Sequence, residues 1–277
     1  MTILKNIGIE DVRKFWDSNP LFVNESQYKP GTLEFFEEHK RIYITDCFAG
    51  NLDRRIFNIN KESSILDLGC GPGFWTIEFC KRGFKKIVGA DLSNNSLQIA
   101  KERAYLYNVA SNSNVTFVQE NAEKMNFPEN SFDHVNCQGV IHHTPNPENA
   151  IMEIHRVLKD NGTALISVYY KNSILKNWPL LRQIIRLFKP GLQGRGRENI
   201  YQKNSINEIV RMYDGALNPL GIAFSKGEFE KLLSPFQVCD IWYGFFPARS
   251  LKIKIPKFLH KVLSRAIPFM IFANVRK

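Results

Sequence analysis

A glycine-rich loop carries the strongest chemical signal in the 277-residue sequence. Residues 67–73 read DLGCGPG and lie directly after an apolar run and directly before a helical pattern. Glycines at 69, 71 and 73 let the backbone turn tightly and let a ligand approach main-chain N–H groups. Phe74 occupies the place where a dinucleotide-binding GxGxxG loop needs its third glycine, so the spacing disfavours a dinucleotide.

Polar residues also follow the next two apolar runs. Asp91 ends the second run, 18 residues after Gly73, where a carboxylate can accept hydrogen bonds from both hydroxyls of a ribose. Asn121, Ala122 and Glu123 follow the third run, where a polar side chain and a backbone N–H can read the edge of an adenine. The three positions together predict a site for a nucleoside-containing cofactor.

Residues 60–170 must position this site, and they alternate between strand and helix patterns. Strands are expected at 64–68, 86–91, 115–119, 132–137 and 163–170, with a turn at 159–162 before the last. Helices are expected at 75–81, at 93–107 with Ser93 as its N-cap, and at 146–158. Nearly continuous apolar strands that alternate with helices predict an α/β fold whose parallel sheet is covered on both faces.

The remaining sequence is less regular. We expect helices at 174–188 and 205–213, a third that opens at Ser225 with a capping box, and strands at 236–245 and 269–276. Residues 256–267 form a basic amphipathic helix. The predicted organisation is an N-terminal helical cap (1–59), a cofactor-binding core (60–170), a helical insert (171–224) and a C-terminal segment that completes the sheet (225–277).

Six segments of the core occur in an order and at spacings that resemble a known family. They are residues 67–73, 89–93, 121–128, 131–133, 139–143 and 153–159. As a set they resemble class I S-adenosylmethionine-dependent methyltransferases of the branch that includes quinone-biosynthesis enzymes. The resemblance implies a Rossmann-like, seven-stranded mixed sheet with an antiparallel last strand, helices on both faces and a mostly helical lid. It also implies S-adenosylmethionine as the cofactor and S-adenosylhomocysteine as its product. No metal is expected, because no acidic cluster suggests a magnesium site.

The resemblance assigns cofactor contacts residue by residue. Glycines 69, 71 and 73 would line the methionine moiety, Asp67 would help to hold its amino end, and Asp91 would bind the ribose. Leu92 would pack on the adenine, and Asn121 stands where the family usually has Asp. The full expected set is Asp67, Gly69, Cys70, Gly71, Gly73, Asp91, Leu92, Asn121, Ala122, Glu123 and Gln138.

The acceptor of the methyl group cannot be read from the cofactor motif, because the sulfonium itself makes the methyl electrophilic. The sequence after the fourth strand, NCQG at 136–139, differs from the Asn-Pro-Pro-Tyr-like loop of enzymes that methylate amino groups of nucleobases or glutamine. His142 and His143 lie near the expected acceptor side, and either is a candidate general base. The alternative is that the pair only shapes a loop.

The distribution of charge limits the possible partners, and the use of cysteine limits the possible cellular compartment. Residues 171–277 carry 19 basic and 6 acidic side chains, whereas residues 1–170 carry 18 and 21. This asymmetry suits an acidic substrate, an anionic membrane or a nucleic acid, or it serves solubility alone. Five cysteines without a CxxC pair, and an N-terminus without an apolar signal core, predict a reduced, cytoplasmic protein without a zinc site.

Acceptor specificity is expected to reside outside the core. Basic amphipathic elements in the last third suggest a lid with an apolar inner face and a cationic rim; the alternative is that their apolar stripes pack against the sheet and their lysines are solvated. Residues 191–197 suggest a loop that closes over substrate. Aromatic residues of the N-terminal segment are expected either to cap the cofactor and form an apolar pocket wall or to belong to a helix packed on the core: Phe15, Trp16, Tyr28, Phe35, Phe36 and Tyr43.

The leading hypothesis is therefore an enzyme that methylates a small lipophilic or acidic acceptor, with peripheral membrane contact left open. One alternative is an RNA-modifying methyltransferase that uses the basic third as its phosphate-binding face. Another is a non-catalytic cofactor-binding protein. The sequence predicts no oligomeric state.

Overall fold

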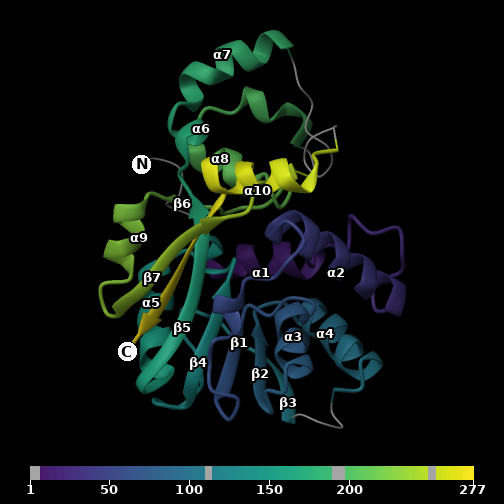
Figure 1. The fold of residues 1–277 in the computed structure, drawn as a ribbon, viewed down its shortest axis with the longest axis vertical. Coiled ribbons are helices and arrows are strands. Elements are labelled where there is room, and N and C mark those ends of the chain that lie inside the picture. The colour runs from purple at the N-terminus through teal and green to yellow at the C-terminus, as the bar shows by residue number, and fades with distance from the viewer. Residues whose placement is uncertain (1–6, 110–113, 189–196, 249–253) are drawn as a thin grey trace.

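The computed structural model describes residues 7–109, 114–188, 197–248 and 254–277 (Figure 1). The side chains of residues 185–199 are not described, so the expected loop at 191–197 lies outside the described side chains. Within the described part of the chain, no helix is long and apolar enough to cross a membrane.

A mixed sheet forms the centre of the fold, in the order β3-β2-β1-β4-β5-β8-β7. The strands of this path are β1 (Ser64–Leu68), β2 (Lys86–Asp91), β3 (Asn114–Gln119), β4 (Phe132–Gln138), β5 (Leu158–Tyr170), β7 (Gln237–Gly244) and β8 (Met270–Arg276). Strands β1 to β5 pair in parallel, and β8 runs antiparallel to both β5 and β7. The predicted seven-stranded mixed sheet is confirmed, and a two-residue eighth strand, β6 (Ala223–Phe224), pairs with β5.

Helices cover both faces of the sheet, as the contacts of two successive side chains in β1 show. Ile65 of β1 packs in a core cluster with residues of α3 (Phe74–Lys81), whereas Leu66 packs in a second cluster with α5 (Pro147–Val157) and α9 (Lys226–Leu232). Because adjacent strand residues point to opposite faces, α3 lies on one face and α5 and α9 lie on the other (Figure 1).

Two local signals predicted from sequence are present in full. Ser93 caps α4 (Asn94–Leu106), because its hydroxyl accepts a hydrogen bond from the Ser96 N–H at 3.0 Å. Ser225 and Glu228 form the predicted capping box of α9, in which each side chain accepts from the other residue's N–H.

Two expectations about element boundaries were wrong. The stretch 174–188 is not one helix but two, α6 (Ser173–Lys176) and α7 (Trp178–Phe188), because Pro179 lacks the N–H that a continuous helix would need there. The expected turn at 159–162 lies within β5 as a bulge: pairing with β4 shifts from Phe132↔Leu158 to His134↔Thr163, and Asn161 adopts a φ of +61°.

The other helices gather at one end of the sheet (Figure 1). The helices α1 (Ile9–Ser18) and α2 (Leu33–Phe48) lie over the carboxyl ends of the parallel strands. At the same end lie α8 (Ile206–Arg211) and α10 (Lys257–Ala266), with α10 in the connection between β7 and β8. Ligands of open α/β sheets bind at the carboxyl ends of the strands, so these helices enclose the place where a ligand is expected.

Candidate functional site

The glycine loop turns the chain sharply between β1 and α3. Gly69, Gly71 and Gly73 all have positive φ, at +70°, +51° and +76°. A Cβ atom on Gly69 would lie 2.2 Å from Cγ2 of Val140, so no larger residue fits there without a shift. The Gly69 N–H also donates to the Ala90 carbonyl at 2.7 Å, which holds the loop against the end of β2.

Asp91 joins this loop to the end of β2. One carboxylate oxygen accepts a hydrogen bond from the Gly71 N–H and the other from the Ser93 N–H, each at 2.8 Å. Burial raises the pKa of Asp91 to about 6. The carboxylate lines the large cavity at this end of the sheet, where it is placed to accept further hydrogen bonds from a ligand's hydroxyl groups.

Asp67 lies behind the cavity wall and does not line it. Its carboxylate accepts from the Thr76 hydroxyl at 2.5 Å and from the Asn136 amide at 2.8 Å, and burial raises its pKa to about 6. Asn136 in turn accepts from the Gln138 amide at 2.7 Å. This series of hydrogen bonds, from Asp67 through Asn136, therefore fixes the Gln138 side chain at the cavity. The Oε1 atom of Gln138 is buried there without a protein partner among the described residues.

The loop after β3 forms the far end of the same cavity. Asn121 and Ala122 line it, and the Asn121 side-chain oxygen accepts from the Glu123 N–H at 3.0 Å. Glu123 does not line the cavity, because Asn146 holds its carboxylate through two hydrogen bonds at 2.7 and 3.0 Å.

Seven of the eleven expected cofactor residues thus line one cavity: Gly69, Gly71, Asp91, Leu92, Asn121, Ala122 and Gln138. Asp67, Cys70, Gly73 and Glu123 lie behind it and shape the loops that form its wall. Glu120 and Ser96, which the sequence analysis did not single out, line it as well. Each lies shortly after an expected strand, Glu120 after 115–119 and Ser96 after 86–91. Their position near the strand ends could have identified them as lining residues.

The cavity extends from the cofactor residues into a largely apolar chamber, with a total volume of about 210 Å³. The aromatic residues that line it come from α1, α2, β5, β8 and the segments after α8 and β7: Trp16, Tyr43, Phe48, Tyr169, Tyr213, Phe245 and Phe272. Of the six aromatic residues expected to cap the cofactor, Trp16 and Tyr43 reach the cavity. Phe35 and Phe36 instead pack in a separate cluster, and Tyr28 is 41% exposed.

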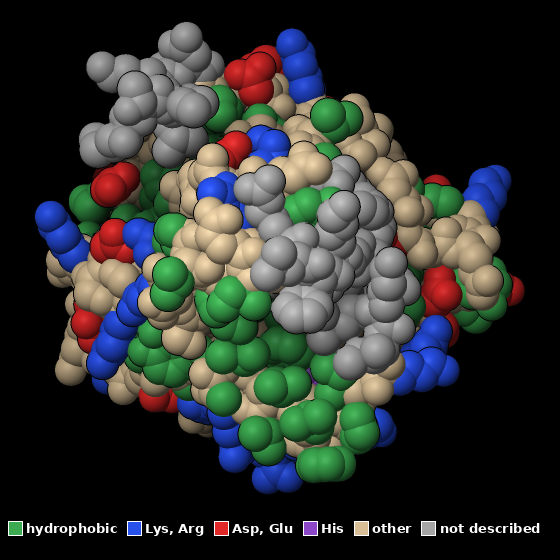
Figure 2. Space-filling view, turned by 90° about the horizontal axis from the view of Figure 1, so that it is seen from above, with side chains coloured by type: hydrophobic (Ala, Val, Ile, Leu, Met, Phe, Trp, Pro, Cys, Tyr) green, Lys and Arg blue, Asp and Glu red, His purple; other side chains and the backbone are tan. Residues whose placement is uncertain are grey.

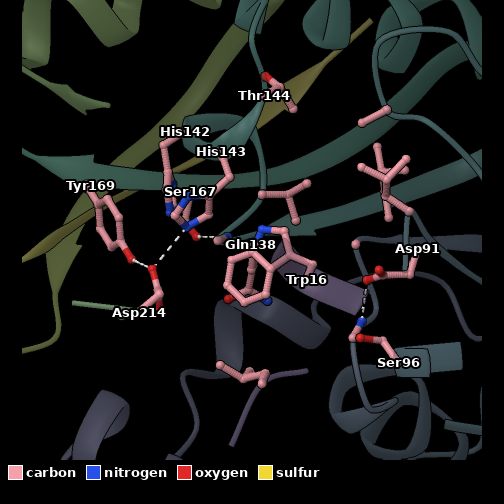
Figure 3. A pocket seen from close by; sticks show the side chains of 18 of the residues that line it. Trp16, Asp91, Ser96, Gln138, His142, His143, Thr144, Ser167, Tyr169 and Asp214 are labelled. Atoms are coloured by element: carbon pink, nitrogen blue, oxygen red, sulfur yellow. Dashed lines mark hydrogen bonds and ion pairs between the residues drawn. The ribbon is translucent and has the colours of Figure 1, made fainter. Parts of the chain in front are cut away.

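A polar cluster interrupts the apolar wall of this chamber (Figure 3). His143 faces the Leu220 carbonyl through Nδ1 at 2.7 Å and the Asp214 carboxylate through Nε2 at 3.1 Å. Tyr169 donates its hydroxyl hydrogen bond to the same Asp214 oxygen. Both ring nitrogens of His143 therefore face oxygen atoms, one a backbone carbonyl and the other the Asp214 carboxylate.

His142 differs from its neighbour in charge and in contacts. Burial and the adjacent His143 lower the pKa of His142 well below its ordinary value, so the ring is neutral. Its ring lies 3.8 Å from that of Tyr169, and its Nδ1 is buried without a partner among the described residues. The sequence therefore found both histidines of this cluster but neither Tyr169 nor Asp214.

These features fit S-adenosylmethionine. Added Cβ atoms on Gly71 and Gly139 would meet nothing within 4 Å, so both glycines leave room for a ligand to approach the backbone. The orphaned Gln138 Oε1 can accept from an ammonium group, and Asp91 can accept from ribose hydroxyls. Among the described residues, no group of three or more His, Cys, Asp or Glu side chains is placed to hold a metal ion.

Comparison with known proteins agrees with this geometry. Residues 66–166, which include the glycine loop, Asp91 and both histidines, match the family model described as "Methyltransferase domain". Residues 66–166 therefore form a methyltransferase domain.

Two curated relatives match the methyltransferase domain. The demethylmenaquinone methyltransferase of Staphylococcus epidermidis is 32% identical over 133 residues, which are 47% of this chain and 52% of the relative. A sterol 24-C-methyltransferase of Saccharomyces cerevisiae is 33% identical over 129 residues, which are 44% of this chain and 33% of the relative. The chain thus spans about half or less of the length of these relatives.

Solved structures share the fold over a larger part of the chain. A SAM-dependent methyltransferase from Methanosarcina mazei superimposes with a TM-score of 0.58 at 18% identity, covering 82% of this chain and 98% of its own. The [4+2]-cyclase SpnF superimposes with a TM-score of 0.51 at 17% identity, covering 78% of this chain and 74% of its own. At such identities the likeness establishes the fold alone.

Proposed function

We propose that this protein transfers a methyl group from S-adenosylmethionine to a small lipophilic acceptor. The observation that carries the proposal is the continuity of one cavity, which joins the glycine loop and Asp91 to an apolar chamber with a polar cluster in its wall. Two matched relatives are named for a demethylmenaquinone and a sterol, both lipophilic acceptors, which supports this class of substrate.

Each end of the cavity has a separate task in this reaction. S-adenosylmethionine, when bound, supplies an electrophilic methyl group, and the bonding electron pair stays on its sulfur. Asp91 and Gln138 would fix the ribose and the methionine end, so that the methyl group points toward the chamber. The aromatic wall would then exclude water and hold the acceptor in line with the methyl group, which lowers the barrier through proximity and orientation.

The polar cluster would handle the acceptor's proton. His143 and Tyr169 both contact the Asp214 carboxylate, so their role would be to hold it in place. We infer that Asp214 takes the proton of a phenol or enol hydroxyl as the acceptor's oxygen or carbon atom attacks the methyl group. Neutral His142 would offer its unpartnered Nδ1 as a hydrogen-bond partner to the acceptor rather than act as the base.

Transfer of labelled methyl groups from S-adenosylmethionine into a fractionated cell extract tests the function. We expect label in the organic-soluble, small-molecule fraction, and none with Asp91→Ala protein. Label in RNA would contradict the proposal and favour a nucleic-acid substrate. Cofactor binding without label in any fraction would contradict methyl transfer and favour a non-catalytic role or an activity of another kind on the same fold.

A further inference from the structure

The helix α10 presents two parallel rows of side chains to solvent. Residues four apart on a helix lie on the same face, so Phe258, Val262 and Ala266 form one row and Lys257, Lys261 and Arg265 form the row beside it. All six residues are exposed, and the exposed fractions of Phe258 and Val262 are 71% and 56%. A row of large apolar side chains that are this exposed indicates a surface that contacts another molecule.

The inward face of α10 fixes this orientation. His260 is buried, and its Nε2 lies 2.8 Å from the Phe246 carbonyl, to which it donates a hydrogen bond. Leu263 and Ile267 lie on the same inward side and are half-buried. The exposed apolar row therefore cannot be the helix's core-facing stripe, because a different stripe already packs on the protein.

The charge of this helix is of a single sign. Residues 254–267 contain four basic side chains, Lys254, Lys257, Lys261 and Arg265, and no acidic one. Next to an apolar row, such a region is complementary to a surface that offers both negative charge and a hydrocarbon layer. A bilayer that contains anionic lipids has both properties, whereas RNA offers phosphate groups but nothing that would bury Val262 or Ala266.

The position of α10 links this face to the cavity. The helix connects β7 to β8, and the residues on either side of it, Phe245 and Met270, line the cavity. At the same end of the molecule, α7 exposes Leu180 and Ile184, with exposed fractions of 73% and 53% (Figure 1). Seen from that end, hydrophobic side chains gather on the surface, and Lys and Arg side chains stand around their margin (Figure 2).

We propose that α10 docks the protein on an anionic lipid bilayer. The row of Phe258 and Val262 enters the boundary between headgroups and acyl chains, and Lys257, Lys261 and Arg265 contact the lipids' phosphate and carboxylate groups. Docking would bring the cavity to the surface from which a lipophilic acceptor is drawn. That use rests on the function proposed above, but the docking itself does not require the protein to be active.

Co-sedimentation with lipid vesicles tests the docking without cofactor or acceptor. We expect the protein to pellet with vesicles of phosphatidylcholine containing roughly one-third phosphatidylserine, to pellet far less with phosphatidylcholine alone, and to be released as salt is raised. A variant with Lys257→Glu and Lys261→Glu should bind at least about tenfold more weakly. Equal pelleting with both vesicle types, or none with either, would overturn the proposal.

Two further pairs of substitutions distinguish a lipid-binding face from a purely electrostatic or nucleic-acid face. Lys85→Glu with Lys86→Glu makes the same change of charge at exposed sites at the amino end of β2, far from α10, and should leave binding unchanged. Phe258→Ser with Val262→Ser keeps the charge and should still weaken vesicle binding about tenfold. If these Ser variants bind vesicles normally, or if mixed-sequence RNA competes the protein off vesicles through the same lysines, α10 does not dock on lipid.

Discussion

The charge and the burial of the Asp91 carboxylate have opposite effects on its ability to bind a ligand. As the proposed ribose ligand, it accepts hydrogen bonds from two hydroxyl groups only when it is ionised, yet burial raises its pKa to about 6. The backbone N–H groups of Gly71 and Ser93 stabilise its charged form, but they do not outweigh the loss of water. The occupancy of the cofactor site should therefore depend on pH in a range where most carboxylates do not titrate.

We expect the affinity for S-adenosylmethionine to rise as the pH rises from 5 to 7. The raised pKa means that protonated Asp91 predominates below about pH 6, and at pH 5 roughly one carboxylate in ten is ionised, so the affinity should be about tenfold lower than at pH 7. Titration calorimetry at several pH values measures it. Asp91→Asn should bind at least about tenfold more weakly at pH 7 and lose most of the pH dependence. A wild-type affinity that is flat over this range would contradict the assignment.

The Asp214 side chain offers a second test, which concerns catalysis rather than cofactor binding. Asp214→Asn removes the proton acceptor held by His143 and Tyr169, so the methylation rate should fall by roughly 10²-fold to 10⁴-fold. The affinity for S-adenosylmethionine should stay unchanged, because Asp214 is bound to the chamber residues and not to the glycine loop. Single-turnover transfer of labelled methyl measures the rate.

A matched variant distinguishes this role from a merely structural one. Tyr169→Phe removes one hydrogen bond to Asp214 but leaves the carboxylate in place, so its rate should fall by about tenfold or less. Circular dichroism and cofactor affinity confirm that each variant is folded. If Asp214→Asn is folded and keeps a rate within about threefold of the wild type, Asp214 is not the base.

The loop that follows β1 could be predicted from sequence because strand, turn and helix are local features. A short apolar run, three glycines with positive φ and a helical pattern mark strand, turn and helix over residues 64–81 within one short stretch of sequence. Asp91 was found for a similar reason, since the ends of adjacent parallel strands must lie together. The helix break before Pro179 was not predicted, because the apolar periodicity continues through it although Pro179 lacks a backbone N–H.

The space around two glycines predicts opposite effects of replacement by alanine, destabilising in the glycine loop and stabilising in α9. Gly69→Ala places a Cβ atom 2.2 Å from Val140 in a backbone with a φ of +70°, so we expect it to destabilise the protein by about 2–5 kcal/mol. Gly227 lies in α9 with open space around it, so Gly227→Ala should stabilise the protein by up to about 1 kcal/mol. Urea unfolding measures both, and a Gly69→Ala variant as stable as the wild type would show that the loop relaxes.

The chamber, in contrast to the loop, is assembled from parts that are far apart in the chain. Trp16 comes from α1, Asp214 from the segment after α8, and Phe245 from the end of β7. The contact between His143 and Asp214 arises because the chain returns over the end of the sheet, where the Ile222 N–H donates to the His142 carbonyl at 2.9 Å. No periodic pattern encodes such a return, so Tyr169 and Asp214 could not be found from sequence alone.

A ligand in this cavity should therefore stabilise more than the glycine loop. We expect S-adenosylhomocysteine at about a hundred times its dissociation constant to slow amide hydrogen exchange by up to about 100-fold wherever exchange requires the ligand to leave. The slowing should include α1, whose Val12 and Trp16 line the cavity, as well as residues 67–73 and 91–93. The helix α9 contributes no lining residue and should change least. Asp91→Ala protein at the same ligand concentration should show no slowing, and slowing confined to the glycine loop would mean that the N-terminal helices do not close over the cofactor.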